Sequence, residues 1–371
     1  MSDLIIVVVF IVSIVLPLAV MVVRPNVTAV ANENRLASPW PPLPADQGSW
    51  EQFPTEATNW FDDHLGLRNW AIQSYNLITV LWLRSPTQLA PRVIPGADGW
   101  LFLNHEKCLD GCRVAFSGEE LEEWGRALRS YQKVVRENSA KLLVVVVPDK
   151  QSIYQEKLPE EIPWTNERSR LQTFINRFHE EVDILDLREL LLTAKAQHDV
   201  YFRYDTHWNE LGGFVSYQAL VRRLGLEPLL WESVEITEQP RNGGDLSKML
   251  ELTQSEEAPK INPRLGFQAR KVEAKPGRAS ADTYYENSSR DSCRVLIFHD
   301  SFFDGFVNPW LAEHFSRTRC VLTYQGPSRE QIVDEHPDIV IFELAERYLM
   351  HPAPLPFDEP SGEPSSHGEW H

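Results

Sequence analysis

The stretch KLLVVVV, Lys141–Val147, is an apolar run that follows one lysine and ends at Pro148. A strand that is apolar at successive positions buries both of its faces, which is typical of a parallel sheet covered by helices on each side. Shorter runs of the same kind occur at residues 182–187, 294–298, 321–324 and 339–342. These runs predict the strands of one mainly parallel sheet.

Amphipathic segments alternate with these strands. Apolar residues at helical spacing predict helices over residues 119–138, 167–181 and 211–224. Alternation of strands with helices predicts the α/β class, with a parallel sheet and helices on both of its faces. The polar stretch over residues 232–290 has no clear period, and the sequence assigns it no element.

The N-terminus is apolar. Leu4–Val23 contains no charged residue and is dense in Ile, Val and Leu, and its length spans a bilayer core of about 30 Å. We expect an uncleaved transmembrane anchor over residues 1–24 rather than a buried core helix. Ala29-Val30-Ala31 resembles a signal-peptide cleavage site, but the apolar run is longer than a usual signal-peptide core.

The remaining chain divides by composition. We expect a linker over residues 25–57, because the part from 38 to 54 is rich in Pro and Trp, and then a globular body over residues 58–350. Apolar spacing predicts a helix over residues 60–83 at the start of the body. Residues 351–371 are polar and rich in Pro, which predicts a disordered tail.

Charge and cysteine content restrict the partners. The 371 residues carry a net charge of −17, which argues against a nucleic-acid partner, because phosphate neutralisation needs a clustered basic face. Cys108 and Cys112 are close enough in sequence to close a small loop, and no second Cys/His pair at zinc-site spacing accompanies them. Cys293 and Cys320 each begin an apolar run. Disulfides and free buried thiols both remain open.

Ser301 directly follows the predicted strand that ends near residue 299 and begins a helical pattern over residues 301–315. In open α/β sheets, ligands bind beyond the carboxyl ends of the strands. A serine at a helix N-terminus would lie beside free N–H groups that suit a developing oxyanion. Plain capping of the helix explains the same residues.

Asp205 and His207 lie two positions apart, which places both side chains on one side of an extended segment. Asp205 can then accept from one ring nitrogen and leave the other to take the proton of Ser301. A metal site made by this pair with His299 and Asp300 is the alternative. We prefer the serine interpretation, without a metal, because Ser301 occupies the corner after the strand.

Several motifs occur in an order that a known family shares. They are WFDDHLGLR at 60–68, GWLF at 99–102, PDK at 148–150, YDTHW at 204–208, GDL at 244–246 and DSF at 300–302. From about residue 58 to 350, the chain resembles the alginate O-acetyltransferase family (AlgX/AlgJ type). The resemblance implies a permuted SGNH hydrolase-like fold.

The resemblance implies Ser301 as nucleophile, His207 as general base and then acid, and Asp205 as the carboxylate that orients His207. It implies an O-acetyltransferase of an exported polysaccharide that works through an acyl-enzyme and needs no cofactor. A polysaccharide acetyl esterase with the same residues, or a non-catalytic glycan-binding scaffold component of a secretion assembly, remains an alternative. His299 stands where the family usually has glycine.

Partners and location follow from the same resemblance. It implies a polysaccharide acceptor and a membrane-bound acetyl-relay protein of the MBOAT type. It also implies an inner-membrane protein with a single-pass anchor and a globular body in the periplasm. Arg24, the one basic residue beside the apolar run, weakly favours the opposite orientation.

Three further residues have two interpretations each. Lys150 follows a strand, and we expect a surface lysine rather than a site residue. Arg347 is expected either to bind the acyl or sugar group or to pair with Glu343 or Glu346. Trp208 is suited both to stacking on a sugar and to core packing.

Overall fold

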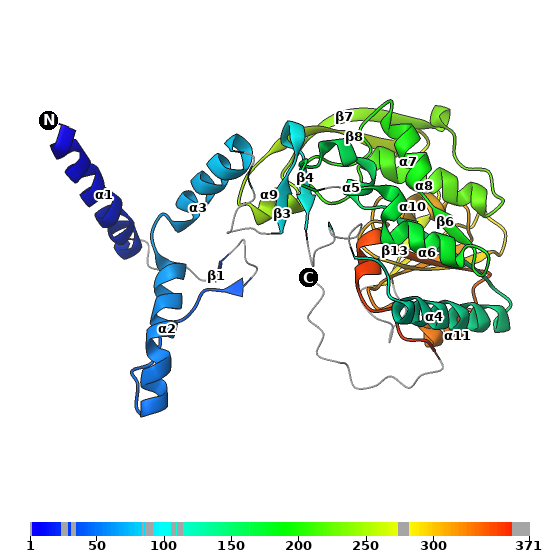
Figure 1. The fold of residues 1–371 in the computed structure, drawn as a ribbon. Coiled ribbons are helices and arrows are strands. Elements are labelled where there is room, and N and C mark those ends of the chain that lie inside the picture. The colour runs from blue at the N-terminus through cyan, green and yellow to red at the C-terminus, as the bar shows by residue number, and fades with distance from the viewer. Residues whose placement is uncertain are drawn as a thin grey trace. The chain divides into compact units, whose positions relative to one another are not determined.

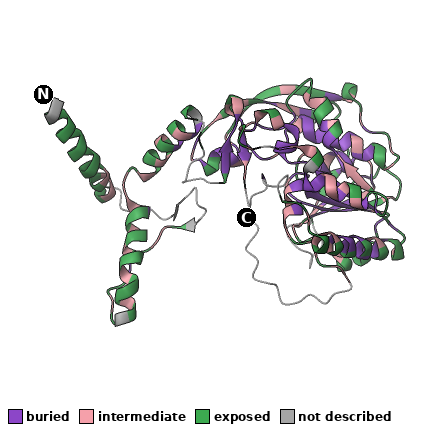
Figure 2. Ribbon diagram, in the orientation of Figure 1, coloured by how far each residue is buried: buried purple, intermediate pink, exposed green. Residues whose placement is uncertain are grey.

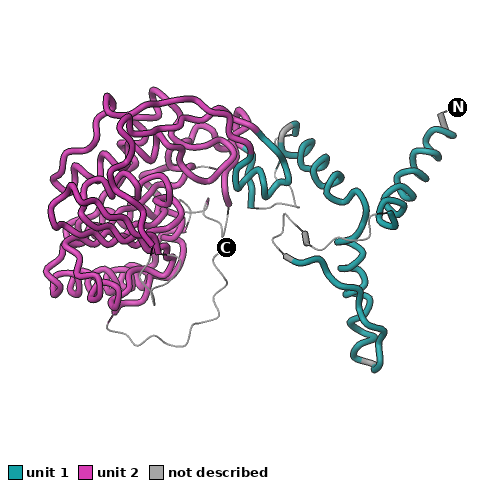
Figure 3. Tube along the Cα trace, turned by 180° about the vertical axis from the view of Figure 1, so that it is seen from behind, with its two compact units in different colours: residues 1–95, 243–254 teal, residues 96–242, 255–371 magenta. Residues whose placement is uncertain are grey.

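In this computed structural model, the described residues are 2–23, 29–30, 35–83, 85, 92–104, 109, 114–162, 164–273 and 282–357. The chain forms two compact units, which Figure 3 distinguishes by colour. The N-terminal unit comprises Met1–Pro95 and Gly243–Gln254, and the sheet unit comprises Gly96–Asn242 and Ser255–His371.

The N-terminal unit begins with the apolar helix α1, Ser2–Val23. Within it, Leu4–Val23 reaches a mean hydropathy of 3.3, and its side chains are largely exposed (Figure 2). The predicted apolar helix is therefore present and is long enough to cross a bilayer core. A membrane anchor and a signal sequence share this length and composition.

Helix α2, Gln47–His64, begins inside the predicted linker and well before residue 60. Asp46 explains this start, because its carboxylate accepts the Ser49 N–H at 2.9 Å and the Ser49 hydroxyl accepts the Asp46 N–H at 3.1 Å. The helix ends at His64, where Leu65 leaves the helical conformation with a ψ of 121°, and Leu67, with a φ of 67°, separates it from the next helix. The prediction of one helix over residues 60–83 is therefore wrong at its start and in its continuity. The other elements of this unit are β1 (Ala29–Val30), β2 (Arg35–Leu36), α3 (Arg68–Asn76), the π-helical η1 (Leu77–Trp82), β3 (Val93–Pro95) and α9 (Asp245–Met249).

Seven strands of the described chain form the sheet of the sheet unit, in the order β6-β5-β13-β11-β12-β10-β9 (Figure 1). Those from β6 to β12 in this order pair in parallel, and β10 and β9 extend the edge antiparallel. This arrangement confirms the predicted mainly parallel sheet. The bounds are β5 (Lys141–Val147), β6 (Ile184–Asp186), β9 (Arg270–Val272), β10 (Thr283–Glu286), β11 (Arg294–His299), β12 (Arg317–Leu322) and β13 (Ile339–Ala345).

Helices cover both faces of this sheet (Figure 1). On one face, side chains of α4, α6 and α11 join Val144, Leu296 and Val340 of the strands in one buried apolar cluster. On the opposite face lie α8 and α10, and α7 packs beside α8. Burial from both sides explains why the strand sequences are apolar throughout. The helix bounds are α4 (Gly118–Glu137), α5 (Lys150–Ile153), α6 (Arg170–Phe178), α7 (Arg188–Lys195), α8 (Glu210–Arg223), α10 (Asn308–Ala312) and α11 (Arg329–Glu335).

Two long strands form an antiparallel ribbon within residues 232–290, the stretch to which the sequence assigned no element. β7, Val234–Asn242, pairs with β8, Ser255–Pro263, along its whole length. Most side chains of both strands are exposed or half-buried, so the ribbon lacks the apolar alternation that marks a strand in a sequence.

The prediction of a helix that begins at Ser301 is wrong. Residues 301–307 form turns, and α10 begins only at Asn308. Gly305 has a φ of 75°, which interrupts a helix, and Pro309 at the first turn of α10 favours a start there. Ser301 therefore does not lie at a helix N-terminus.

The cysteine and tail predictions have separate outcomes. Cys293 and Cys320 are free thiols, and Cys320 lies opposite Ile297 in the register of β11 with β12. Cys108 and Cys112 lie outside the described residues, as do residues 358–371 of the predicted tail. Residues 351–357 contact α4, where the Tyr131 hydroxyl donates to the Leu355 carbonyl at 3.0 Å and the Ser130 hydroxyl accepts the Phe357 N–H at 3.1 Å.

Candidate active site

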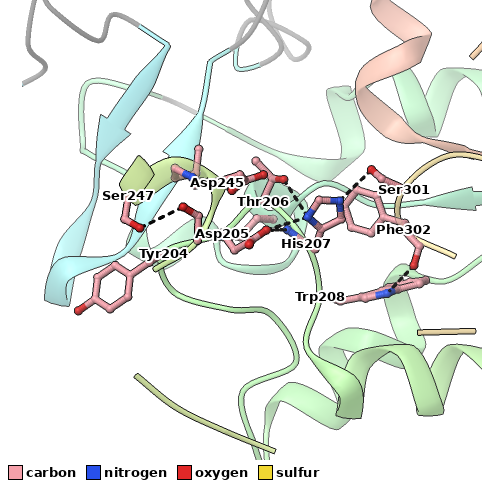
Figure 4. A network of polar contacts seen from close by, with 12 residues as sticks. Tyr204, Asp205, Thr206, His207, Trp208, Asp245, Ser247, Ser301 and Phe302 are labelled. Atoms are coloured by element: carbon pink, nitrogen blue, oxygen red, sulfur yellow. Dashed lines mark hydrogen bonds and ion pairs between the residues drawn. The ribbon is translucent and has the colours of Figure 1, made fainter. Parts of the chain in front are cut away.

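The structure brings Ser301, His207 and Asp205 into one chain of hydrogen bonds (Figure 4). His207 Nε2 lies 2.8 Å from Ser301 Oγ, and His207 Nδ1 lies 2.7 Å from Asp205 Oδ1. With a proton on Nδ1, the ring donates a hydrogen bond to Asp205 through Nδ1 and accepts one from the Ser301 hydroxyl at Nε2. This order of groups prepares a serine for nucleophilic attack.

A tight turn, rather than an extended strand, places Asp205 beside His207. Asp205 Oδ1 accepts the backbone N–H of His207 at 3.1 Å as well as the ring N–H, so one oxygen holds both the backbone and the ring of His207. On either side of the turn, Tyr201 and Trp208 form an antiparallel bridge. The predicted proximity is present, but its cause is side-chain to backbone bonding.

Trp208 links the His207 segment to the serine loop. Its indole N–H donates to the Phe302 carbonyl at 3.0 Å, as Figure 4 shows, and its ring meets that of Phe302 edge-on at 5.4 Å. Trp208 is fully buried, so it packs in the core and is not available to stack on a sugar.

Asp300 anchors the loop that carries Ser301. Its two carboxylate oxygens accept the N–H groups of Phe302 and Ala345, each at 2.8 Å, and its own N–H donates to Glu343 at 2.8 Å. Burial, reinforced by the charge of Asp300, raises the pKa of Glu343 well above its usual value. The serine loop is therefore bonded directly to the end of β13.

His299 points into the protein. The ring Nδ1–H donates to the Asp300 carbonyl at 2.7 Å, and Nε2 accepts from the Asn308 amide at 3.1 Å. Burial lowers the pKa of His299, in agreement with the neutral ring that these two bonds require. Both nitrogens of His299 and both oxygens of Asp300 thus have partners other than the Asp205–His207 pair.

Arg241 of β7 is a site residue that the sequence did not indicate. Its Nη2 lies 2.6 Å from Asp205 Oδ2, and its guanidinium lies 3.9 Å from the Phe202 ring centre. Burial pushes the pKa of Asp205 upward, but hydrogen bonds from His207 and Arg241 outweigh it and hold that pKa below its usual range. Asp205 is therefore an ionised carboxylate. No sequence pattern near either residue signals this pair.

A group of buried charges lies at the carboxyl ends of β5 and β13. Arg347 pairs with Asp149 at 2.6 Å rather than with Glu343 or Glu346. Glu346 accepts the Asp149 N–H at 3.0 Å and the Ser152 hydroxyl at 2.6 Å. Burial and the charge of Asp149 raise the pKa of Glu346 to about 7.

Two more residues have surroundings that the sequence did not predict. Lys150 is only 3% exposed and donates to the carbonyls of Leu101 and Arg203 at 2.9 and 3.2 Å, so the expectation of a surface lysine is wrong. Tyr324 follows β12, and the nearby Ser301 hydroxyl is one of the groups that act on the pKa of its phenol. Burial raises the pKa of Tyr324, so its phenol stays protonated and able to donate.

Comparisons with known proteins agree with this architecture. The family described as SGNH hydrolase-like domain, acetyltransferase AlgX, matches residues 93–292, an interval that contains Asp205 and His207 and ends before Ser301. The Probable alginate O-acetylase AlgJ of Pseudomonas aeruginosa is 32% identical over 164 residues, which are 44% of this chain and 38% of that protein. Its namesake from Pseudomonas putida is 29% identical over 172 residues, 45% of this chain and 40% of that protein. The chain thus spans about two fifths of the length of these curated relatives.

Solved structures share the fold. Bacillus cereus PatB1 with a sulfonyl adduct superposes with a TM-score of 0.56 at 19% identity, over 69% of this chain and 95% of that one. A DHHW family protein from Eubacterium siraeum gives a TM-score of 0.52 at 15% identity, over 70% of this chain and 96% of that one. At these identities the likeness concerns the fold alone.

Proposed function

Because this chain belongs to the family of SGNH hydrolase-like AlgX-type acetyltransferases, we propose that it is an O-acetyltransferase of an exported polysaccharide. The hydrogen-bond chain from Ser301 through His207 to Asp205 carries the proposal. The relatives' names make alginate the first acceptor to test.

The first half-reaction transfers an acetyl group from the donor to Ser301. Ser301 Oγ attacks the carbonyl carbon of an acetyl donor while its proton moves to His207 Nε2, and Asp205 stabilises the imidazolium. The bond between the acetyl carbon and the donor's leaving group then breaks, and the leaving group takes the proton from His207. The product is acetyl-Ser301 with neutral His207.

The second half-reaction transfers the acetyl group from Ser301 to the acceptor. A polysaccharide hydroxyl gives its proton to His207 Nε2 and attacks the acetyl carbon of acetyl-Ser301. As the ester bond to Ser301 breaks, His207 returns the proton to Ser301 Oγ. With water as the acceptor, the same steps describe an acetyl esterase.

The developing oxyanion needs hydrogen-bond donors other than a helix N-terminus, since residues 301–307 form turns. We assign this role to the Tyr324 hydroxyl, and its proximity to Ser301 supports the assignment. Tyr324→Phe keeps the ring contact with Tyr348, at 5.7 Å, and removes only the donor. We expect it to lower kcat by about 10- to 100-fold with little change in KM. A loss that falls on KM instead would assign Tyr324 to binding.

Helix α1 supports an inner-membrane location. In this proposal, residues 1–24 form the anchor, residues 58–350 form the catalytic body in the periplasm, and a membrane-bound acetyl-relay protein of the MBOAT type supplies acetyl groups. An N-terminal anchor would keep the body close to such a donor. Mass spectrometry of the N-terminus of the mature protein tests the anchor, because cleavage after Ala31 would remove it.

The decisive experiment uses the full-length protein with p-nitrophenyl acetate as donor and, in separate reactions, alginate oligosaccharides or cellotetraose as acceptor. We expect a burst of p-nitrophenol, acetyl on Ser301 in the mass spectrum, and O-acetylated sugar as product. Ser301→Ala should abolish all three. Free acetate as the only product would indicate the esterase, and a Ser301→Ala variant with unchanged activity would refute the serine mechanism. Glycan binding without any burst would indicate a scaffold protein.

A further inference from the structure

A cavity of about 780 Å³ lies within the sheet unit, bounded by the β7–β8 ribbon, the start of α8 and the loop after α7. Small-ligand sites commonly enclose roughly 300–1,000 Å³, so this cavity has room for a short oligosaccharide. Phe202 and Arg203, which directly precede the turn of Asp205, form part of its wall.

The cavity wall is linked to the triad through one ion-pair network. Glu256 lines the cavity and accepts the backbone N–H of Arg203 at 2.8 Å. Arg241 lies 3.9 Å from Glu256 and 2.6 Å from Asp205. Two side chains, Glu256 and Arg241, therefore connect a ligand in the cavity to Asp205, and no triad residue lines the cavity itself.

The lining has the groups that recognise sugars. Trp231 and Ile236 line the cavity and remain 41% and 46% exposed, although such side chains are usually buried. Aromatic rings pack well against the C–H faces of sugar rings, and carboxylates accept hydrogen bonds from sugar hydroxyls. Asp199, Glu238 and Glu257 supply carboxylates to the same wall.

The charge of the wall selects among glycans. The lining contains one arginine, Arg203, against four acids, which are Asp199, Glu238, Glu256 and Glu257. A chain with a net charge of −17 adds to the negative potential. This excess of acids would repel a polyuronate and would leave an uncharged sugar unaffected.

We propose that this cavity is a binding subsite for the acceptor glycan and that it takes an uncharged oligosaccharide in preference to a polyuronate. The proposal rests on the proposed transferase function and specifies its acceptor class.

Binding to the full-length Ser301→Ala protein tests the site without turnover. The probes are cellotetraose, an uncharged oligomer, and tetramannuronate, a polyuronate, measured by calorimetry. We expect cellotetraose to bind at least 10-fold more tightly than tetramannuronate. Trp231→Ala should weaken cellotetraose binding at least 10-fold. The double variant Glu238→Gln/Glu257→Gln should reduce the difference in affinity between the two probes. Equal binding by all variants, or tighter binding of tetramannuronate, would overturn the proposal.

Controls separate folding from binding. Trp231 also meets the Phe214 ring at 4.8 Å, so thermal unfolding of Trp231→Ala is compared with that of the parent. Trp50→Ala removes an exposed tryptophan of α2, and Glu235→Gln removes an exposed acid of β7 that does not line the cavity. Both controls should leave cellotetraose binding unchanged.

The two proposals fail differently. On an otherwise native chain, Trp231→Ala should form acetyl-Ser301 from p-nitrophenyl acetate at the parent rate, with only the acceptor KM raised. A parent protein that forms no acetyl-Ser301 would refute the transferase function, even if cellotetraose binds. Normal acetyl-enzyme formation with an unchanged acceptor KM in Trp231→Ala would refute the acceptor subsite alone.

Discussion

Arg241 Nη2 lies 2.6 Å from Asp205 Oδ2, and His207 Nδ1 lies 2.7 Å from Asp205 Oδ1. Each oxygen of this carboxylate thus has one cationic or ring N–H partner. Since Arg241 comes from β7 and Asp205 from the turn before α8, the exposed ribbon holds the orientation of the carboxylate that orients His207.

Arg241→Gln should lower kcat for acetyl-Ser301 formation about 10-fold, a barrier change of about 1.4 kcal/mol, because Asp205 loses the partner that orients it. Arg241→Lys should lose less, since it keeps the charge. Without Arg241, the pKa of Asp205 rises toward its usual value, so activity should fall at a higher pH on the acid side than in the parent. Stopped-flow burst rates over about pH 4–9 measure both effects. Arg264→Gln, just beyond β8, is the matched control. If Arg241→Gln keeps the parent's kcat and the parent's pH–rate profile on the acid side, Arg241 is a purely structural residue.

Trp208→Phe should lower the free energy of unfolding by about 1–3 kcal/mol, because the buried Phe302 carbonyl loses its donor. The burst rate should fall as well, since Phe302 follows Ser301 directly. Urea unfolding and burst kinetics are the measurements, with Trp50→Phe as an exposed control. Unchanged stability would mean that another group satisfies the carbonyl.

His299→Gly places the family's usual residue at this position. We expect a loss of stability of about 1–3 kcal/mol, because the Asn308 amide loses its acceptor and a buried side chain is removed. Because the two ring nitrogens of His299 bond to Asp300 and Asn308 rather than to the triad, the burst rate of the folded variant should remain within about threefold of the parent. A large gain in burst rate would show instead that His299 hinders the acyl site. Thermal unfolding and burst kinetics, measured together, separate the two outcomes.

Glu346→Gln should change how stability depends on pH. The pKa of Glu346 is about 7 in the folded protein and about 4.3 in an unfolded chain, so the folded state binds this proton more tightly. Stability from this group is therefore present below pH 4 and is lost as the pH rises through about 7, by an amount on the order of 4 kcal/mol. The glutamine variant should lose this dependence, so its free energy of unfolding should fall less between pH 5 and pH 8 than that of the parent. Urea unfolding at both values measures it, with the exposed Glu330→Gln as control. An identical pH dependence in both variants would contradict the assignment.

Local patterns predicted the central elements well and the polar ones poorly. β5 has the predicted bounds, and α8 differs from its prediction by one residue at each end, because apolar runs and helical spacing are read from neighbouring residues. The β7–β8 ribbon escaped prediction because it exposes most of both strands. The helix predicted at Ser301 failed because Gly305 and Pro309 decide where that helix can begin.

The sequence by itself determined the apolar strands, the N-terminal helix, and the order in which Asp205, His207 and Ser301 occur. These features depend on residue type and on short-range spacing. Tertiary structure alone decided that Ser301 lies 2.8 Å from His207, that Arg241 pairs with Asp205, and that His299 turns toward Asn308. The first two pairs are 94 and 36 residues apart and meet only when strand register and loop paths are set, and His299 reaches Asn308 across the turns of residues 301–307. No local pattern encodes these contacts.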